Sequence, residues 1–224
     1  MRIGIELNGV LRDTIGKMID VYDKAYLSME PTDKEDPLLK QYKAVSTSDG
    51  IEFDEIIEVE SDFIYEFNGP VTSLNLMEHF KFRDKEELYS FLYEEFPMQI
   101  FGHASSVEYS SFNDLNDIYR NLRESHDILI VSDEIGKSKP SSLFFLSKFG
   151  CLIEKVKFYS NTTIESMWDE VDIIVTANPD IIQSHPDNKI VVKFKQEYNK
   201  QIQSKYEINK IIDLEEIINK IIND

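Results

Sequence analysis

The second half of the chain alternates short, largely apolar runs with segments whose apolar residues recur at helical spacing. The clearest run is 127–131, where four aliphatic residues, Ile-Leu-Ile-Val, follow Asp127 without a break, and similar runs occur at 156–159, 172–176 and 190–194. A strand that is apolar on both faces is typical of a parallel sheet covered by helices. Repeated strand-helix-strand units therefore predict an α/β fold with a doubly wound parallel sheet and right-handed crossovers.

The first and last elements extend this pattern to both ends of the chain. Residues 2–7 predict a buried strand, which the turn Asn8-Gly9 separates from a helix at 15–26. Further helices are expected at 84–96, at 112–122, after Pro140, at 164–168, and after Asp213. We expect the last helix to bury one face against the core, with these residues on it: Leu214, Ile217, Ile218, Ile221 and Ile222.

Residues 30–69 lack a clear periodicity. Residues 30–49 contain Pro31, Pro37 and many charged residues, which predicts a solvent-facing connection or a flexible segment of a cap. Residues 51–69 mix acidic and apolar residues without one period, so no element type is assigned. Together with the helices around them, these residues suggest an insertion between the first strand and the rest of the sheet.

The charge balance restricts the classes of partner. The chain has 24 Lys and Arg against 42 Asp and Glu, a net charge of −18. This charge disfavours nucleic acids and anionic membranes, and favours either simple solubility or a basic protein partner. No apolar run reaches membrane-spanning length and no signal segment begins the sequence, so we expect a cytoplasmic protein, or a virion component if the source is a phage.

The cysteine and histidines do not suggest a disulfide or a zinc site. Cys151 is the only cysteine, which excludes an intrachain disulfide, and its apolar neighbours predict a small core residue. The four histidines are spread along the chain without the spacing of zinc ligands. They are His79, His103, His126 and His185.

The segment Ile3–Thr14 resembles the first motif of the haloacid-dehalogenase-like (HAD) superfamily, in which an apolar strand ends in Asp-x-Asp-Gly-Thr/Val-Leu. In that motif the first Asp attacks phosphorus, and the second protonates the leaving group and later activates water. Here Glu6 and Asn8 stand at these two positions.

Other HAD landmarks follow in order. Ser132 matches the phosphate-binding Ser or Thr of the second motif, and Lys139 matches the Lys of the third, with Lys137 as a weaker substitute. Ser160 and Asn161 fall where the fourth motif supplies magnesium-binding acids. Residues 168–179 look like the closing strand of HAD nucleotidases, and 194–199 resembles, less closely, the Tyr-Asn element that follows it.

The resemblance implies a Rossmann-like α/β core and an inserted cap. The core would comprise residues 1–14 and 112–224, and a mainly helical cap of the C1 type would comprise residues 15–111. Among its members, the matched residues most resemble the nucleotidase or phosphatase branch of the superfamily.

The departures from the motifs predict lost catalysis. The extra methylene of Glu6 moves the attacking oxygen, and an error of about 1 Å costs on the order of a hundredfold in rate. The amide of Asn8 cannot exchange a proton, which typically costs roughly a hundred- to ten-thousandfold. Ser160 and Asn161 remove charge from the magnesium position, although this cation prefers carboxylate oxygens. We therefore expect no metal or cofactor and a pseudophosphatase with a structural, regulatory or assembly role.

Two alternatives stay open. A weak Mg-dependent phosphomonoesterase resembling a 5′-nucleotidase would use Glu6 as its nucleophile, and a phosphate or nucleotide sensor would bind its ligand through Ser132 and Lys139 without turnover. Both of these residues also have a plainer interpretation, as the end of a strand and a solvated side chain before a proline. Asp133 and Glu134 could replace the lost metal ligands, although acids before a helix more often interact with its N-terminal dipole.

Overall fold

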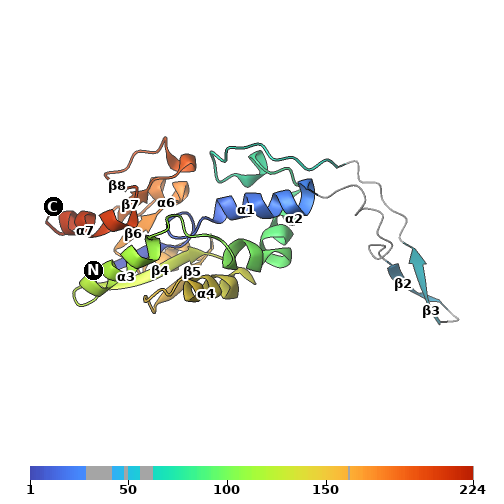
Figure 1. Ribbon diagram of the computed structural model, residues 1–224, viewed down its shortest axis with the longest axis horizontal. Helices are drawn as coiled ribbons and strands as arrows, with labels where there is room; N and C mark the ends of the chain where they lie inside the picture. Colours follow the sequence, from blue (N-terminus) through green and yellow to red (C-terminus); the bar gives the residue numbers. More distant parts are fainter. Residues whose placement is uncertain (29–41, 48–49, 56–62, 161, 224) are drawn as a thin grey trace.

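A computed structural model of the chain describes residues 1–28, 42–47, 50–55, 63–160 and 162–223 (Figure 1). The first half of the described chain contains, in order, β1 (Arg2–Glu6), α1 (Thr14–Tyr22), the π-helical η1 (Asp23–Leu27), β2 (Tyr42–Thr47), β3 (Gly50–Glu55), the 3-10 turn η4 (Leu76–Glu78), α2 (Lys85–Ser90), and the π-helical η5 (Phe91–Glu95) and η6 (Met98–Gly102). The second half contains α3 (Ser111–Leu122), β4 (Asp127–Asp133), α4 (Ser138–Lys148), β5 (Val156–Tyr159), α5 (Ile164–Trp168), β6 (Ile173–Thr176), α6 (Pro179–Gln183), β7 (Ile190–Phe194), the 3-10 turn η7 (Glu197–Asn199), β8 (Tyr206–Ile208), the 3-10 turn η8 (Ile211–Asp213) and α7 (Leu214–Asn223).

Six of the strands form one sheet in the order β5-β4-β1-β6-β7-β8, and every neighbouring pair is parallel. β1 lies in the middle, with β4 on one side and β6 on the other. The prediction of an α/β fold with a parallel sheet is therefore confirmed. Because ligands in such sheets bind at the carboxyl ends of the strands, the residues that follow β1, β4 and β6 are the first place to look for a site.

Alternate residues of the strands enter two separate apolar clusters, one on each face of the sheet. Ile3, Ile5 and Ile130 pack in the cluster that α3, α4 and α7 cover, while Leu129 packs in the cluster that α5 and α6 cover. A side chain at Gly4 would place its Cβ 2.7 Å from Cγ1 of Val171, so the sheet centre leaves room only for glycine there. Helices therefore pack on both faces of the sheet.

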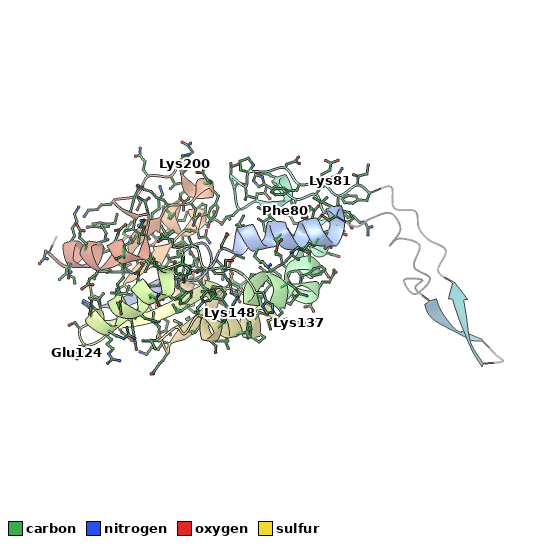
Figure 2. The ribbon with its side chains drawn as sticks, viewed as in Figure 1. Phe80, Lys81, Glu124, Lys137, Lys148 and Lys200 are labelled. Carbon is green, nitrogen blue, oxygen red and sulfur yellow. The ribbon has the colours of Figure 1, made fainter. Side chains whose placement is uncertain are left out.

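Residues 15–111, which we call the inserted segment, contain a third apolar cluster of their own. Its centre is the buried Tyr22, whose ring packs edge-on against Phe80, Phe82 and Phe91 with centroid distances of 5.1–5.9 Å. The Tyr22 hydroxyl donates to the backbone oxygen of Lys81 at 2.7 Å. Figure 1 shows α1 and α2 to the right of the sheet, and Figure 2 labels Phe80 and Lys81 beside α1.

The strands β2 and β3 form a separate antiparallel pair at the far right of Figure 1. Part of this pair departs from expectation, because β2 lies within residues 30–49, which were predicted to be a connection. The remainder of that expectation falls on residues 30–41 and 48–49, outside the described residues.

Most other elements match their predictions, and the misses are short. No sequence pattern predicted α6, which has 5 residues, or β8, which has 3. In α7, Leu214, Ile218 and Ile221 are buried as expected, whereas Ile222 is 47% exposed. Among the helices that the structure describes, none is long and apolar enough to span a membrane.

Candidate functional site

The carboxyl ends of β1, β4 and β6 bring together polar residues that are unusually well buried. Glu6 is the last residue of β1 and is only 2% exposed. Thr176 ends β6 and Ser132 lies near the end of β4, and both are fully buried. Buried polar side chains require hydrogen-bond partners, so the contacts of each residue show what this site can do.

Two hydroxyl groups hold the carboxylate of Glu6. Its Oε1 accepts a hydrogen bond of 2.7 Å from the Tyr159 hydroxyl, and its Oε2 accepts one from the Thr176 hydroxyl. Burial raises the pKa of Glu6 to about 7, although the two hydroxyls oppose this, and the nearby charge of Asp133 raises it further. The Glu6 side chain is thus fixed inside the protein, with both oxygens occupied.

The amide of Asn8 belongs to a second network of hydrogen bonds. Its Oδ1 accepts hydrogen bonds from Arg12 Nη2 at 2.6 Å and from Thr14 Oγ1 at 2.7 Å. Its Nδ2 makes longer contacts with Ser132 Oγ at 3.4 Å and the Asp133 backbone oxygen at 3.5 Å. An amide suits this position because it offers an acceptor to Arg12 and Thr14 and donors to the end of β4.

Arg12 is the centre of that network, and its side chain is completely buried. Its guanidinium pairs with Glu134 Oε1 at 2.5 Å and also donates to Ser142 Oγ and the Phe101 backbone oxygen. The guanidinium carbon lies 5.0 Å from the Phe101 ring centroid and 5.4 Å from that of Phe145. One side chain thus links the end of β1 to β4, to α4 and to the inserted segment.

The carboxylate of Glu134 is the anionic partner in this network. Its Oε1 accepts from Arg12, from Ser142 Oγ and from Ser132 Oγ at 3.0 Å. Its Oε2 is buried and finds no hydrogen-bond partner among the described residues. Glu134 precedes α4 by four residues, so its role here is an ion pair and not the helix-dipole contact that the sequence favoured.

Asp133 and Ser132 complete the end of β4. Asp133 is half-buried, and burial together with the charge of Glu134 raises its pKa to about 6. Ser132, the expected phosphate ligand, is 0% exposed and donates its hydroxyl proton to Glu134. Its hydroxyl therefore faces an internal carboxylate.

The segment after β7 covers the end of β1. Gln196 donates to the Gly9 backbone oxygen at 2.7 Å, and buried Asn199 donates to the backbone oxygens of Ala177 and Phe194, both at 2.9 Å. Gly9 has φ of +74°, and a Cβ on it would lie 2.0 Å from the Tyr198 hydroxyl oxygen. Tyr198 therefore closes directly over the turn that follows Glu6 and Asn8.

The remaining candidate residues lie elsewhere. Lys139 is exposed, with its Nζ 5.9 Å from the Phe158 ring centroid, and Lys137 pairs with Glu94 at 2.5 Å. Ser160 follows β5, which β4 separates from β1, and its hydroxyl contacts Thr162 and Thr163 at 3.0 and 3.2 Å. Asn161 lies outside the described residues. The structure therefore brings Glu6, Asn8 and Ser132 to the same edge of the sheet. The residue that it places against Glu6 is Thr176 and not Ser160.

The donor set around Glu6 does not fit the magnesium ion that the HAD resemblance implies. Mg²⁺ requires several oxygen ligands in near-octahedral geometry, usually carboxylates and waters. The Glu6 oxygens accept from two hydroxyls, and Oδ1 of Asn8 accepts from a cation. Within the described ranges, no group of three or more His, Cys, Asp or Glu residues has the arrangement of a metal site.

Sequence reasoning missed three residues of the site, namely Arg12, Tyr159 and Thr176. Arg12 had one usable signal, since it is a lone cation between Leu11 and Asp13 in the turn after a buried strand. Thr176 could have been found from its place at the end of an apolar run. In a parallel sheet the carboxyl end of that strand lies at the same edge as Glu6. Tyr159 reaches Glu6 across β4, and nothing in its local sequence indicates that reach.

Comparison with known proteins does not place the chain in a family: no family model matches it, and no curated protein matches its sequence.

Proposed function

We propose that this chain is a catalytically inactive protein with a HAD-like, doubly wound core and a cap formed by the inserted segment, and that it acts by binding a protein partner. The observation that carries this proposal is the state of Glu6. Its two oxygens accept hydrogen bonds from Tyr159 and Thr176 in a site that is 2% exposed. Each oxygen of this buried carboxylate therefore faces a hydroxyl group of the protein.

The sheet supports the fold part of the proposal. Its strand order places the first strand in the centre, and helices pack on both faces. The inserted segment has its own apolar cluster, as a cap would require. Ala104 and Val107, which lie just before the proposed boundary at residue 112, pack with the apolar cluster of the core.

The Asn8 network supports the loss of catalysis. In a HAD hydrolase this position would move a proton to the leaving group, whereas here the amide bonds Arg12 and Thr14. The cation nearest to this position is thus an internal guanidinium. Neutral Thr176 beside Glu6 adds no negative charge with which to hold a divalent cation.

The phosphate-sensor alternative receives less support. Ser132 donates to Glu134 inside the protein, and Lys139 contacts the Phe158 ring at the surface. A bound phosphate would have to break the hydrogen bond between Ser132 and Glu134. It would also have to draw Lys139 in from the surface. The weak phosphomonoesterase would in turn require an oxygen of Glu6, which is 2% exposed, to reach the phosphorus of a substrate.

A repair experiment tests the proposal. The native chain, Glu6→Asp/Asn8→Asp/Ser160→Asp, and Glu6→Asp/Asn8→Asp/Thr176→Asp would be assayed with Mg²⁺ on a panel of phosphomonoesters and for Mg²⁺ binding by calorimetry. We expect the native chain to be inert, and any recovered Mg²⁺ binding to follow Thr176→Asp and not Ser160→Asp, because only Thr176 touches Glu6. Enzyme-like turnover by the native chain would refute the proposal.

A further inference from the structure

A surface hollow of about 280 Å³ lies on the inserted segment between η4 and the helical run α2–η5. Its walls are mainly apolar, with Leu74, Leu76 and Met77 on one side and Leu88, Tyr89 and Leu92 on the other. A hollow of this size accepts one or two large side chains, and methionine and leucine walls adapt readily to different shapes. The Glu6 network uses none of these six residues.

Large apolar side chains on both sides of the hollow are exposed to solvent. Leu74 is 39% exposed and Tyr89 is 46% exposed. The Tyr89 ring packs on Tyr93 with a centroid distance of 5.1 Å, which holds it in place at the edge of the hollow. Exposed apolar groups around a concave surface are characteristic of interaction sites, and a fixed tyrosine loses little conformational entropy on binding.

The surroundings of the hollow are acidic. The stretch 74–95, which contains every residue of the wall, has 6 Asp and Glu against 3 Lys and Arg. Near the hollow, Glu78 accepts hydrogen bonds of 2.8 Å from Ser73 Oγ and Asn75 Nδ2. These bonds lower the pKa of Glu78 and keep it charged, while Lys85 is the one base in the wall.

We propose that this hollow is a docking surface for a basic amphipathic segment of another protein. One aliphatic or aromatic side chain of the partner inserts between Leu74 and Tyr89, and its Lys and Arg residues face the acidic surroundings. This inference rests on the proposed non-catalytic role, since it names the kind of partner that the role requires. A second copy of the chain is a poor occupant, because two such acidic surfaces repel each other.

The probe is a labelled synthetic peptide of Leu and Lys at amphipathic helical spacing, measured by fluorescence anisotropy at low and physiological salt. We expect saturable binding that weakens with salt, and an affinity loss of about tenfold or more for Leu74→Ser/Tyr89→Ser, since anchors in the centre of an interface dominate its energy. The matched control is Tyr109→Ser, because Tyr109 is fully exposed and does not line the hollow. Circular dichroism and thermal unfolding of each variant establish that it is folded.

Four results would overturn the docking surface. They are no saturable binding by the native chain, unchanged affinity in folded Leu74→Ser/Tyr89→Ser, equal binding of a scrambled peptide of the same composition, and equal binding of a peptide with Glu in place of Lys. Phosphomonoester assays on the same preparations keep the two proposals apart. Turnover by a chain that binds the peptide would refute only the non-catalytic role, and an inert chain that does not bind it would refute only the docking surface.

Discussion

The guanidinium of Arg12 and the carboxylate of Glu134 form a 2.5 Å ion pair in which both side chains are 0% exposed. Burying two charges costs free energy that only good geometry and further hydrogen bonds offset. Here Asn8 accepts a hydrogen bond from Arg12, and Ser142 donates one to Glu134. The pair therefore stabilises the fold only while both members are present.

We predict that Arg12→Met lowers the free energy of unfolding by about 3–5 kcal/mol, because it leaves Glu134 buried without its cation. Arg12→Met/Glu134→Met should recover most of this loss, since it removes the second charge. Urea unfolding of both variants and of the native chain measures the difference. A single variant within about 1 kcal/mol of the native chain would show that the ion pair is not formed as described.

Glu6 should make stability depend on pH. Burial raises its pKa from 4.5 to about 7, so between these two values the folded chain binds the proton that the unfolded chain has released. The contribution of Glu6 is then fully present below pH 4.5 and is lost as the pH rises toward 7, by on the order of 3 kcal/mol.

The test is unfolding of the native chain and Glu6→Gln across that range. Asp133, whose pKa is raised to about 6, acts in the same direction in both proteins, so the difference between them reports Glu6 together with its coupling to Asp133. We predict that the native chain loses stability relative to Glu6→Gln as the pH rises. A difference that stays flat would mean that Glu6 is solvated.

The effects of the two hydroxyl donors on Glu6 should be measurable one at a time by mutation. Both hydroxyls favour the ionised carboxylate, so Tyr159→Phe and Thr176→Val should each raise the pKa of Glu6 above that in the native chain. Each should also cost about 1–3 kcal/mol, because a buried acceptor loses its partner. A titration of the Glu6 carboxyl carbon by NMR measures the first effect, and a pKa that falls in either variant would contradict the assignment.

Gly9 provides a steric test of the covering segment. Its φ of +74° strains any other residue, and a Cβ would lie 2.0 Å from the Tyr198 hydroxyl oxygen. We predict that Gly9→Ala costs about 1–3 kcal/mol and that Gly9→Ala/Tyr198→Ala recovers part of it, since the clash disappears while the backbone strain remains. Equal losses of stability for Gly9→Ala in the two backgrounds would show that Tyr198 does not cover the turn.

The sequence was sufficient for five of the six strands of the central sheet, because each of these five is a local apolar run. Residues 128–131 and 173–175 needed no distant contact to be recognised, since burial on both faces appears directly in their composition. The 3-residue β8 could not be found in this way, because so short a segment has no period and is held by its pairing with β7.

The site was harder to predict because its contacts join residues far apart in the chain. Position along the motif found Glu6, Asn8 and Ser132, which share one edge of the sheet. It also assigned Ser160 to the magnesium-binding position of the motif, whereas the residue that contacts Glu6 from a neighbouring strand is Thr176. Strand order depends on how the whole chain packs, and no local pattern reports it.

The most direct measurement of the proposed loss of catalysis is Mg²⁺-dependent hydrolysis of a phosphomonoester panel by the native chain and by Glu6→Gln, purified in the same way. Any trace activity from a contaminant appears equally in both preparations, so we predict identical rates at every Mg²⁺ concentration. A native rate well above that of Glu6→Gln, and dependent on Mg²⁺, would show that Glu6 leaves Tyr159 and Thr176 to act as a nucleophile, which would contradict the proposed function.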